Sequence, residues 1–316
     1  MTSASLHTLP RIRRVVTVGV VGAAMGLSLL LSACGTTSSP TTGSGTPNAN
    51  CPSADTVASW HLVNSGKLTI ASDTTYAPAE FSDPSNPSSY IGYDMDLARE
   101  FAKRLCLQPD IIKADFGSII SDVSGPALGQ QRYDMSISSF TINSDRQKKV
   151  DMIPYFTAGE SILTPTGNPK NITSFETMCG KIIAAQDNTV ELAELQDANG
   201  TGDGSSGQAP VCKDNKIKVV HFVSQNDVVL QVVNGSADAS YQDQPVTDYF
   251  VSKNPGKLQS GGITVPPSPQ GIVMRKDNPK LEQAIKDALN AMRTDGTYLK
   301  ILKNWGVDKL AYPPLS

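Results

Sequence analysis

Three short polar stretches carry the residue types that could do chemistry in this chain. Each begins where a predicted strand ends, and together they supply carboxylates, hydroxyl groups, amides and a guanidinium: 72–78, 138–146 and 242–245. Ligands of open α/β sheets sit outside the carboxyl ends of the strands, so the three stretches are expected to meet at one binding site. Gly-x-Ser-x-Gly, Ser-x-x-Lys and His-Glu-x-x-His are absent from the sequence, so these common catalytic motifs do not accompany them.

A second reactive group is predicted at Cys34. Three arginines precede an uncharged apolar run over 15–31, and Leu31-Ser32-Ala33 leads into the cysteine. This order is typical of a lipoprotein signal, with 1–33 as the signal peptide and Cys34 as the lipidated (palmitate-bearing) residue. The alternative is a retained membrane helix, for which the run is short against the ~17–25 residues that a span needs. We therefore expect a protein held by lipid on the outer face of the cytoplasmic membrane.

The residues after Cys34 are expected to form a tether. Residues 35–50 are almost all Gly, Ser, Thr, Pro and Asn, and we place the whole of 34–66 in the lipidated cysteine and flexible tether. Removal of 1–33 leaves 24 basic and 30 acidic side chains, a net charge of −6. A nucleic-acid partner is therefore not expected.

Four cysteines remain in an exported chain, which predicts disulfides. Sequence alone allows three pairings, and we favour Cys179 with Cys212 because each precedes a strand-like run, and neighbouring strand starts can bring their Cα atoms within bridging distance. Cys51 with Cys106 is then the remaining pair. A zinc site is the alternative, but the chain lacks Cys-x-x-Cys spacing and no metal or other cofactor is expected.

Alternating strands and helices must position these residues. Strands are predicted at 68–71, 111–112, 135–138, 181–185 and 217–220, and a helix capped by Asp96 is predicted to bury Leu97, Phe101 and Leu105. Asn278-Pro279 predicts the start of another helix, which ends at Gly296. This alternation favours an α/β fold with mostly parallel sheets.

An ordered series of short motifs runs from about Lys67 to Trp305. It comprises Asp73-x-x-Tyr76-x-Pro78-x-Glu80-Phe81, Gly92-Tyr93-Asp94-Met95-Asp96-Leu97, Tyr133-Asp134, Ser139-x-Thr141-x-x-x-x-Arg146, Gly235-x-x-Asp238-Ala239, Asp243-x-Pro245, Gly271-Ile272-x-x-Arg275-Lys276 and Asp295-Gly296-Thr297-Tyr298. The series resembles that of the family 3 extracellular solute-binding proteins, the amino-acid receptors of ABC importers. Each motif alone is weak, but the ordered set is specific.

The resemblance implies a two-lobed periplasmic-binding-protein-like fold of type II. Each lobe is then a mostly parallel sheet flanked by helices, and the ligand lies in the cleft between the lobes. Lobe 1 is expected over 67–165 plus 266–316 and lobe 2 over 166–265, with crossings near 164–168 and 265–269. Proline and flanking glycine at these crossings fit hinges between two rigid bodies.

The same resemblance implies a site that binds both charged ends of an amino acid. Arg146 is expected to grip the α-carboxylate, helped by Thr141, Ser138 and Ser139, while Asp243 accepts the α-ammonium. Without the family pattern, Arg146 is equally a helix surface charge and Asp243 a loop acid.

Five further positions are implied as ligand contacts. Tyr76 and Phe116 match aromatic walls around the aliphatic part of the ligand, although both fit ordinary core aromatics as well. Asp73 and Gln186 match positions that meet the ligand side chain, which favours a polar or basic amino acid over glutamate; Asp73 also fits a turn cap. Thr189 belongs to a helix start, where free N–H groups suit a carboxylate.

Several positions depart from the family pattern. Ala79 stands where an aromatic residue is common, which predicts an enlarged pocket, and Asn188 stands where glycine is usual. Asparagine tolerates left-handed backbone, so the turn is expected to survive. Insertions are expected at 121–125 and 200–207.

The resemblance implies a monomeric receptor that catalyses no reaction of its own. Its partners would be an amino-acid ligand and an ABC permease with its ATPase. An exported prephenate-type dehydratase on the same scaffold is the enzyme alternative, and it needs a general acid in the cleft. A ligand sensor is the third possibility.

Overall fold

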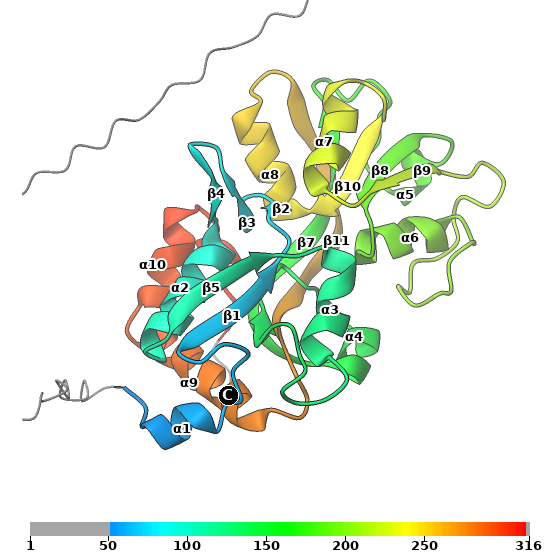
Figure 1. Ribbon diagram of the computed structural model, residues 1–316. Helices are drawn as coiled ribbons and strands as arrows, with labels where there is room; N and C mark the ends of the chain where they lie inside the picture. The colour runs from blue at the N-terminus through cyan, green and yellow to red at the C-terminus, as the bar shows by residue number, and fades with distance from the viewer. Residues whose placement is uncertain (1–50, 314–316) are drawn as a thin grey trace, which may run out of the picture. The chain divides into compact units, whose positions relative to one another are not determined.

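Eight strands form one sheet in the computed structural model, which describes residues 51–313. Their order is β5-β1-β6-β11-β7-β10-β8-β9 (Figure 1). The strands are β1 (Lys67–Ser72), β5 (Gln108–Lys113), β6 (Met135–Ser136), β7 (Asp151–Pro165), β8 (Ile182–Gln186), β9 (Lys218–Phe222), β10 (Ala239–Asp243) and β11 (Leu258–Met274). The second, small sheet consists of β2 (Thr75–Tyr76), β3 (Glu80–Asp83) and β4 (Asn86–Ile91).

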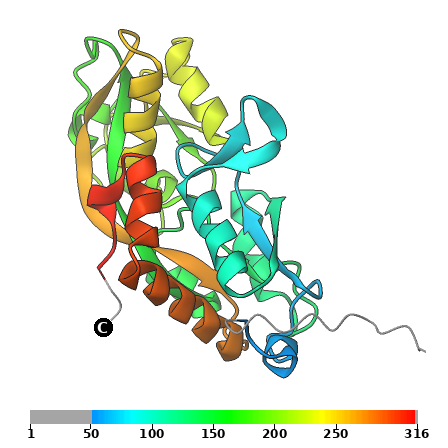
Figure 2. The same cartoon turned by 90° about the vertical axis from the view of Figure 1, so that its left-hand side faces the viewer.

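The large sheet has two parallel strand groups joined by two long strands. β1 pairs in parallel with β5 and β6, and β8 pairs in parallel with β9 and β10. β7 and β11 are antiparallel to each other, and Figures 1 and 2 show them running side by side. We call β5-β1-β6 the first strand group and β10-β8-β9 the second. The predicted α/β architecture with mostly parallel sheets is confirmed.

Helices fill most of the connections between strands. They are α1 (Ala54–Ala58), α2 (Tyr93–Arg104), α3 (Phe116–Ser124), α4 (Ser144–Lys149), α5 (Phe175–Met178), α6 (Val190–Ala198), α7 (Gln225–Val233), α8 (Gln244–Lys253), α9 (Pro279–Thr294), α10 (Thr297–Asn304) and the 3₁₀ helix η1 (Asp308–Leu310). Within residues 51–313, no helix combines the length and the apolar character that crossing a bilayer requires. Cys34 and the signal predicted before it lie outside the described residues.

Each strand group has its own apolar core. Leu68 and Ile70 of β1 are fully buried in a cluster with Leu97 of α2 and Leu281 of α9. Ile183 of β8 belongs to a separate cluster with helices α5 and α6. Burial of one large apolar side chain contributes about 1.5–3 kcal/mol to the stability of the fold, so each cluster stabilises its own strand group.

The helix predicted from Asn278-Pro279 is confirmed as α9, with Leu281, Ile285 and Leu289 fully buried. The helix predicted from Asp96 begins one turn earlier. Tyr93 and Asp94 donate their backbone N–H groups to the carbonyls of Pro78 and Ala79, so α2 starts after Gly92. Gly92 has φ +132°, and a Cβ there would lie 2.0 Å from the Ala79 oxygen. Asp96 therefore lies in the first turn rather than at the cap.

The predicted tether extends too far toward the folded part of the chain. Residues 51–66 were included in it, but they contain α1 and pack against the first strand group. Trp60 is only 3 % exposed, and its carbonyl accepts a hydrogen bond from Asn278. Val63 donates its N–H to Asp134, and Cys51 is bonded to Cys106. Apolar residues, among them Val57, Trp60 and Leu62, distinguish this segment from the polar residues 35–50 and pack on the core of the first strand group.

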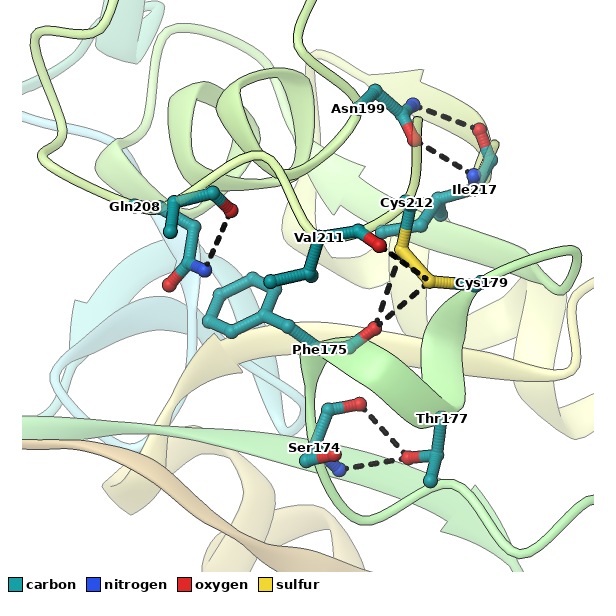
Figure 3. Close-up of a disulfide and its surroundings, with 10 residues drawn as sticks. Ser174, Phe175, Thr177, Cys179, Asn199, Gln208, Val211, Cys212 and Ile217 are labelled. Atoms are coloured by element: carbon teal, nitrogen blue, oxygen red, sulfur yellow. Dashed lines mark hydrogen bonds between the residues drawn. A yellow bond between two sulfur atoms is a disulfide. The ribbon is translucent and has the colours of Figure 1, made fainter. Parts of the chain in front are cut away.

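Both predicted disulfides are present. Cys179 and Cys212 have Cα atoms 5.2 Å apart, beside the starts of the parallel neighbours β8 and β9 (Figure 3). Beside this bond, Asn199 exchanges two hydrogen bonds with the backbone of Ile217. The predicted glycine-rich insertion over 200–207 is therefore fixed at both ends.

Candidate functional site

The three polar stretches converge on one closed cavity between the strand groups. Nine of the ten predicted ligand residues line this cavity: Tyr76, Phe116, Ser138, Ser139, Thr141, Arg146, Gln186, Thr189 and Asp243. Val190 and Glu191 complete the lining. Its free volume of about 10 Å³ suffices for about one water molecule. The cavity in this conformation is too small for an amino acid.

Arg146 reaches the cavity from α4, whose N-cap Asn143 accepts the Arg146 backbone N–H. One guanidinium nitrogen donates to the Thr141 carbonyl at 2.8 Å, and the group lies over the rings of Phe116 and Phe140 at 5.5 and 5.0 Å. Burial lowers the pKa of Arg146 to about 10, so the group stays cationic at neutral pH. The remaining N–H donors suit a carboxylate.

Asp243 lines the same cavity as Arg146 and comes from the end of β10. Its Oδ2 accepts hydrogen bonds from the Tyr76 hydroxyl at 2.8 Å and from the Gln270 amide at 2.9 Å. Burial raises the pKa of Asp243 to about 7, and the bond from Tyr76 opposes that rise. The other carboxylate oxygen takes no part in these two bonds. Asp243 is therefore suited to accept a hydrogen bond from a cationic group of a ligand.

Asp73 is the one predicted residue that does not line the cavity. It accepts hydrogen bonds from Thr75 and from the Gln186 amide, so it joins the two strand groups beside the cavity. Burial raises the pKa of Asp73 to about 6, and the Gln186 bond opposes that rise. A contact between Asp73 and ligand requires Gln186 to move.

The turn before α6 keeps the geometry expected of it. Asn188 has φ +63°, as predicted for an asparagine replacing glycine. Its carbonyl faces an Arg146 nitrogen at 3.4 Å, and Thr189 caps α6 by accepting the Leu192 N–H. The free N–H groups of the first turn of α6 lie beside the cavity-lining Thr189 and Val190.

Glu191 is a cavity residue that the sequence did not reveal. It is 3 % exposed and lies in the first turn of α6. Burial, with Asp243 and Glu160 nearby, raises its pKa well above the usual range, while Arg146 opposes the rise. The helical periodicity of α6 does not indicate which side of the helix faces the cavity. Glu191 can therefore be identified as a cavity residue only from the tertiary structure.

Ala79 does not have the predicted effect on the pocket. It is fully buried in the apolar cluster of the first strand group and is not a lining residue. Its carbonyl accepts the Asp94 N–H at the start of α2. The small side chain therefore fits the core beneath the small sheet and does not widen the cavity.

Within residues 51–313, no group of three or more His, Cys, Asp or Glu side chains is placed to hold a metal ion. The four cysteines of the zinc alternative are paired as disulfides. The donor set around the cavity is one guanidinium, buried carboxyls, hydroxyls and amides. It can hold a small zwitterion by hydrogen bonds.

Known proteins share both the sequence pattern and the fold. The chain is 28 % identical over 258 residues to the lysine/arginine/ornithine-binding periplasmic protein of Escherichia coli K12, covering 79 % of this chain and 91 % of that protein. An ancestral arginine-binding protein bound to arginine matches with a TM-score of 0.67 and 30 % identity, covering 76 % of this chain and 98 % of that structure. The ancestral amino acid-binding protein AncCDT-1, a precursor of cyclohexadienyl dehydratase, matches with a TM-score of 0.63 and 29 % identity, covering 76 % and 95 %.

The family model for bacterial extracellular solute-binding proteins, family 3, matches residues 68–308. This range includes every strand of both sheets except the first residue of β1, and all the lining residues of the cavity. The match covers most of the chain, as the ordered motifs predicted. This chain belongs to the bacterial extracellular solute-binding proteins, family 3.

Proposed function

We propose that this protein is an extracytoplasmic receptor that binds a polar or basic amino acid and delivers it to an ABC-type permease. The observation that carries the proposal is that Arg146 and Asp243 line the same closed cavity. A cation and a carboxyl group around one cavity match the two charged ends of an amino acid. Two of the relatives named above are an arginine-binding protein and a lysine/arginine/ornithine-binding protein, which supports the same ligand class.

We assign the two strand groups to two lobes that open and close. Lobe 1 contains β1, β5, β6 and α9, and lobe 2 contains β8, β9 and β10. Glu160 to Leu163 of β7 pair with β10, which favours a first crossing near 158–160 rather than at the predicted 164–168. The second crossing stays at 265–269, where the pairing of β11 with β7 is irregular. Because the closed cavity has so little free volume, ligand entry requires the lobes to separate.

The ligand ends are assigned as the family pattern implies. Arg146 and Thr141, with Ser138, Ser139 and Thr189, surround the α-carboxylate, and Asp243 accepts the α-ammonium. Tyr76 and Phe116 enclose the aliphatic part, and Gln186 with Asp73 faces the far end. Glu191 adds a second carboxyl group to the cavity, and because burial raises its pKa well above the usual range, it offers a ligand both a hydrogen-bond donor and an acceptor.

We place the receptor at the outer face of the cytoplasmic membrane, held by lipid on Cys34 after removal of the signal peptide. The tether then spans 35–50, about 22 Å by the scaling of flexible linkers. An anchored monomer stays within reach of its permease. The dehydratase precursor among the structural matches keeps the enzyme alternative, which needs a general acid in the cleft. We favour the receptor because Asp243 accepts hydrogen bonds from Tyr76 and Gln270, as an ionised carboxylate does.

Gly117 gives a test of lobe closure. A Cβ at Gly117 in α3 would lie 2.3 Å from the side-chain amide of Asn188, which belongs to the other lobe. Substitution to Ala and then to Leu is expected to weaken amino-acid binding progressively, up to roughly 100-fold for Leu, because overpacking costs about 1–3 kcal/mol. The unliganded protein should not lose stability, since glycine is the weaker helix former by about 1 kcal/mol.

Asn188→Gly supplies the matched control for that series. It removes the obstructing side chain, and glycine accepts the left-handed backbone at this position. The double variant Gly117→Leu/Asn188→Gly should therefore regain most of the affinity lost by Gly117→Leu in calorimetry. Unchanged affinity of Gly117→Leu would show that closure does not bring these residues together.

A thermal-shift screen tests the proposed function itself. A ligand that binds only the folded state raises the melting temperature. At a ligand concentration a hundredfold above Kd, it adds about 2.7 kcal/mol to the free energy of unfolding. All twenty amino acids are screened with the purified protein. A basic or amide amino acid is expected to give the largest shift. If none of the twenty stabilises the protein, the receptor proposal is wrong.

A further inference from the structure

Two carboxyl groups lie buried against each other beneath the cavity. Glu80 of β3 is 1 % exposed and Asp94 of α2 is fully buried, and their side chains are in hydrogen-bonding contact. No ion pair within the described residues includes either group. The titratable groups that interact with the pair are Asp73, Tyr93, Tyr155 and Tyr298, and none of these is a cation that would offset a second negative charge.

The hydrogen bonds of this pair leave one acceptor unsatisfied. Glu80 accepts from the hydroxyls of Ser138 at 3.0 Å and Ser139 at 3.3 Å, one on each oxygen. Asp94 Oδ2 accepts from the Ser139 N–H at 3.1 Å and the Tyr155 hydroxyl at 2.7 Å. Asp94 Oδ1 is buried, and no donor in residues 51–313 reaches it as long as Glu80 is ionised. A proton on Glu80 turns that carboxyl into the missing donor.

We propose that Glu80 and Asp94 share one proton, and that this pair is the positioning element for Ser138 and Ser139 at the ligand cavity. Both serines line the cavity, and Ser139 is held at φ +50°, a left-handed backbone that few residues other than glycine adopt. The N–H of Ser139 bonds to Asp94 and its hydroxyl bonds to Glu80, so the pair fixes both the backbone and the side chain. Burial raises the pKa of Glu80 well above its usual range and that of Asp94 to about 7, in keeping with a retained proton.

The shared proton predicts a specific dependence of stability on pH. In the unfolded chain Glu80 ionises at its ordinary pKa, whereas in the folded protein the pair keeps its proton to higher pH. Stability is therefore complete below the ordinary pKa and is lost as the pH rises through the folded pKa. Glu80→Gln keeps a donor and an acceptor at this position without a titrating proton.

The experiment measures unfolding of the purified full chain between pH 6 and 9. The unfolding constant of the wild type should rise by up to about tenfold more per pH unit than that of Glu80→Gln. Asp243, Glu160, Glu191 and Glu194 titrate in both proteins and cancel in the comparison. Glu176→Gln, at an exposed glutamate, should follow the wild type. Parallel curves for wild type and Glu80→Gln would overturn the shared proton.

The positioning role rests on the proposed function and has its own readout, the affinity for L-arginine. Glu80→Ala should lose at least about tenfold, and Glu80→Gln should restore affinity to within about threefold of wild type. Equal losses in both variants would refute the positioning role. A wild type that binds no amino acid would refute the proposed function, while the pH comparison still decides the proton. If Glu80→Ala does not fold, a loss of more than about threefold in Glu80→Gln still refutes the positioning role, and the pH comparison still decides the proton.

Discussion

Arg146→Ala is expected to weaken binding of the amino-acid ligand more than any other single substitution proposed for this site. Removal of one partner of a buried charged pair costs about 2–5 kcal/mol, which corresponds to a loss of roughly 30-fold to several thousand-fold in affinity. The loss is expected because the guanidinium is the one cationic group among the residues that line the cavity. Arg146→Lys keeps the charge but not the planar fork, so it should recover only part of the affinity. Calorimetric titration measures both variants.

Lys149→Ala is the matched control for Arg146→Ala. Lys149 lies on the same helix, α4, is exposed and does not line the cavity. Its substitution should leave affinity unchanged. Arg146→Ala should also leave the thermal transition of the unliganded protein within a few degrees of wild type, because its hydrogen bond to the Thr141 carbonyl is local to one segment. Wild-type affinity in Arg146→Ala would refute the assignment of Arg146 to the α-carboxylate of the ligand.

Asp243→Asn is expected to weaken ligand binding by about 10- to 150-fold, since a hydrogen bond to a charged group contributes about 1.5–3 kcal/mol. The substitution keeps the size of the side chain and an oxygen for the bonds from Tyr76 and Gln270. It removes the negative charge that attracts the α-ammonium. Calorimetry at pH 8 gives the clearest measurement, because burial sets the pKa of Asp243 near 7 and the carboxylate is then ionised.

Asp227→Asn is the control for Asp243→Asn. Asp227 is an exposed acid in the first turn of α7 and does not line the cavity. The control should bind as the wild type does. If Asp243→Asn binds with wild-type affinity at pH 8, the ammonium end of the ligand lies elsewhere.

Much of the site was predictable because its residues follow strand ends within recognisable motifs. Tyr76 follows β1, Ser138 and Ser139 follow β6, and Asp243 ends β10, so the parallel strand groups bring them together. The aromatic side chains of Tyr76 and Phe116 could not be oriented from spacing alone. The structure places both on the cavity.

Residues whose position depends on tertiary contacts could not be predicted. Glu191 faces the cavity because α6 packs on β8, and the sequence does not specify that face. Glu80 and Asp94 belong to two of the family motifs, but their contact depends on the packing of the small sheet against α2. The segment 51–66 was misassigned to the tether because its contacts, from Asn278 to Trp60 and from Cys51 to Cys106, join residues far apart in sequence.

The first crossing that we propose differs from the one predicted at 164–168 because of the long strand β7. Proline and glycine over 164–168 suggested a hinge, but β7 runs unbroken to Pro165 and pairs with β10 from Glu160. The strand passes from one group to the other at a point without a distinctive sequence signal. Irregular pairing with β11 around Val265 and Ser268 marks that point only in the structure.

Calorimetric titration of the wild-type protein with L-arginine, beside agmatine, tests the central claim most directly. Agmatine keeps the guanidinium and the aliphatic chain of arginine but lacks the α-carboxylate. If Arg146 binds the α-carboxylate and Asp243 the α-ammonium, the protein should bind L-arginine and bind agmatine at least about 30-fold more weakly. Equal affinity for the two, or agmatine binding without arginine binding, would contradict a site built for both charged ends of an amino acid.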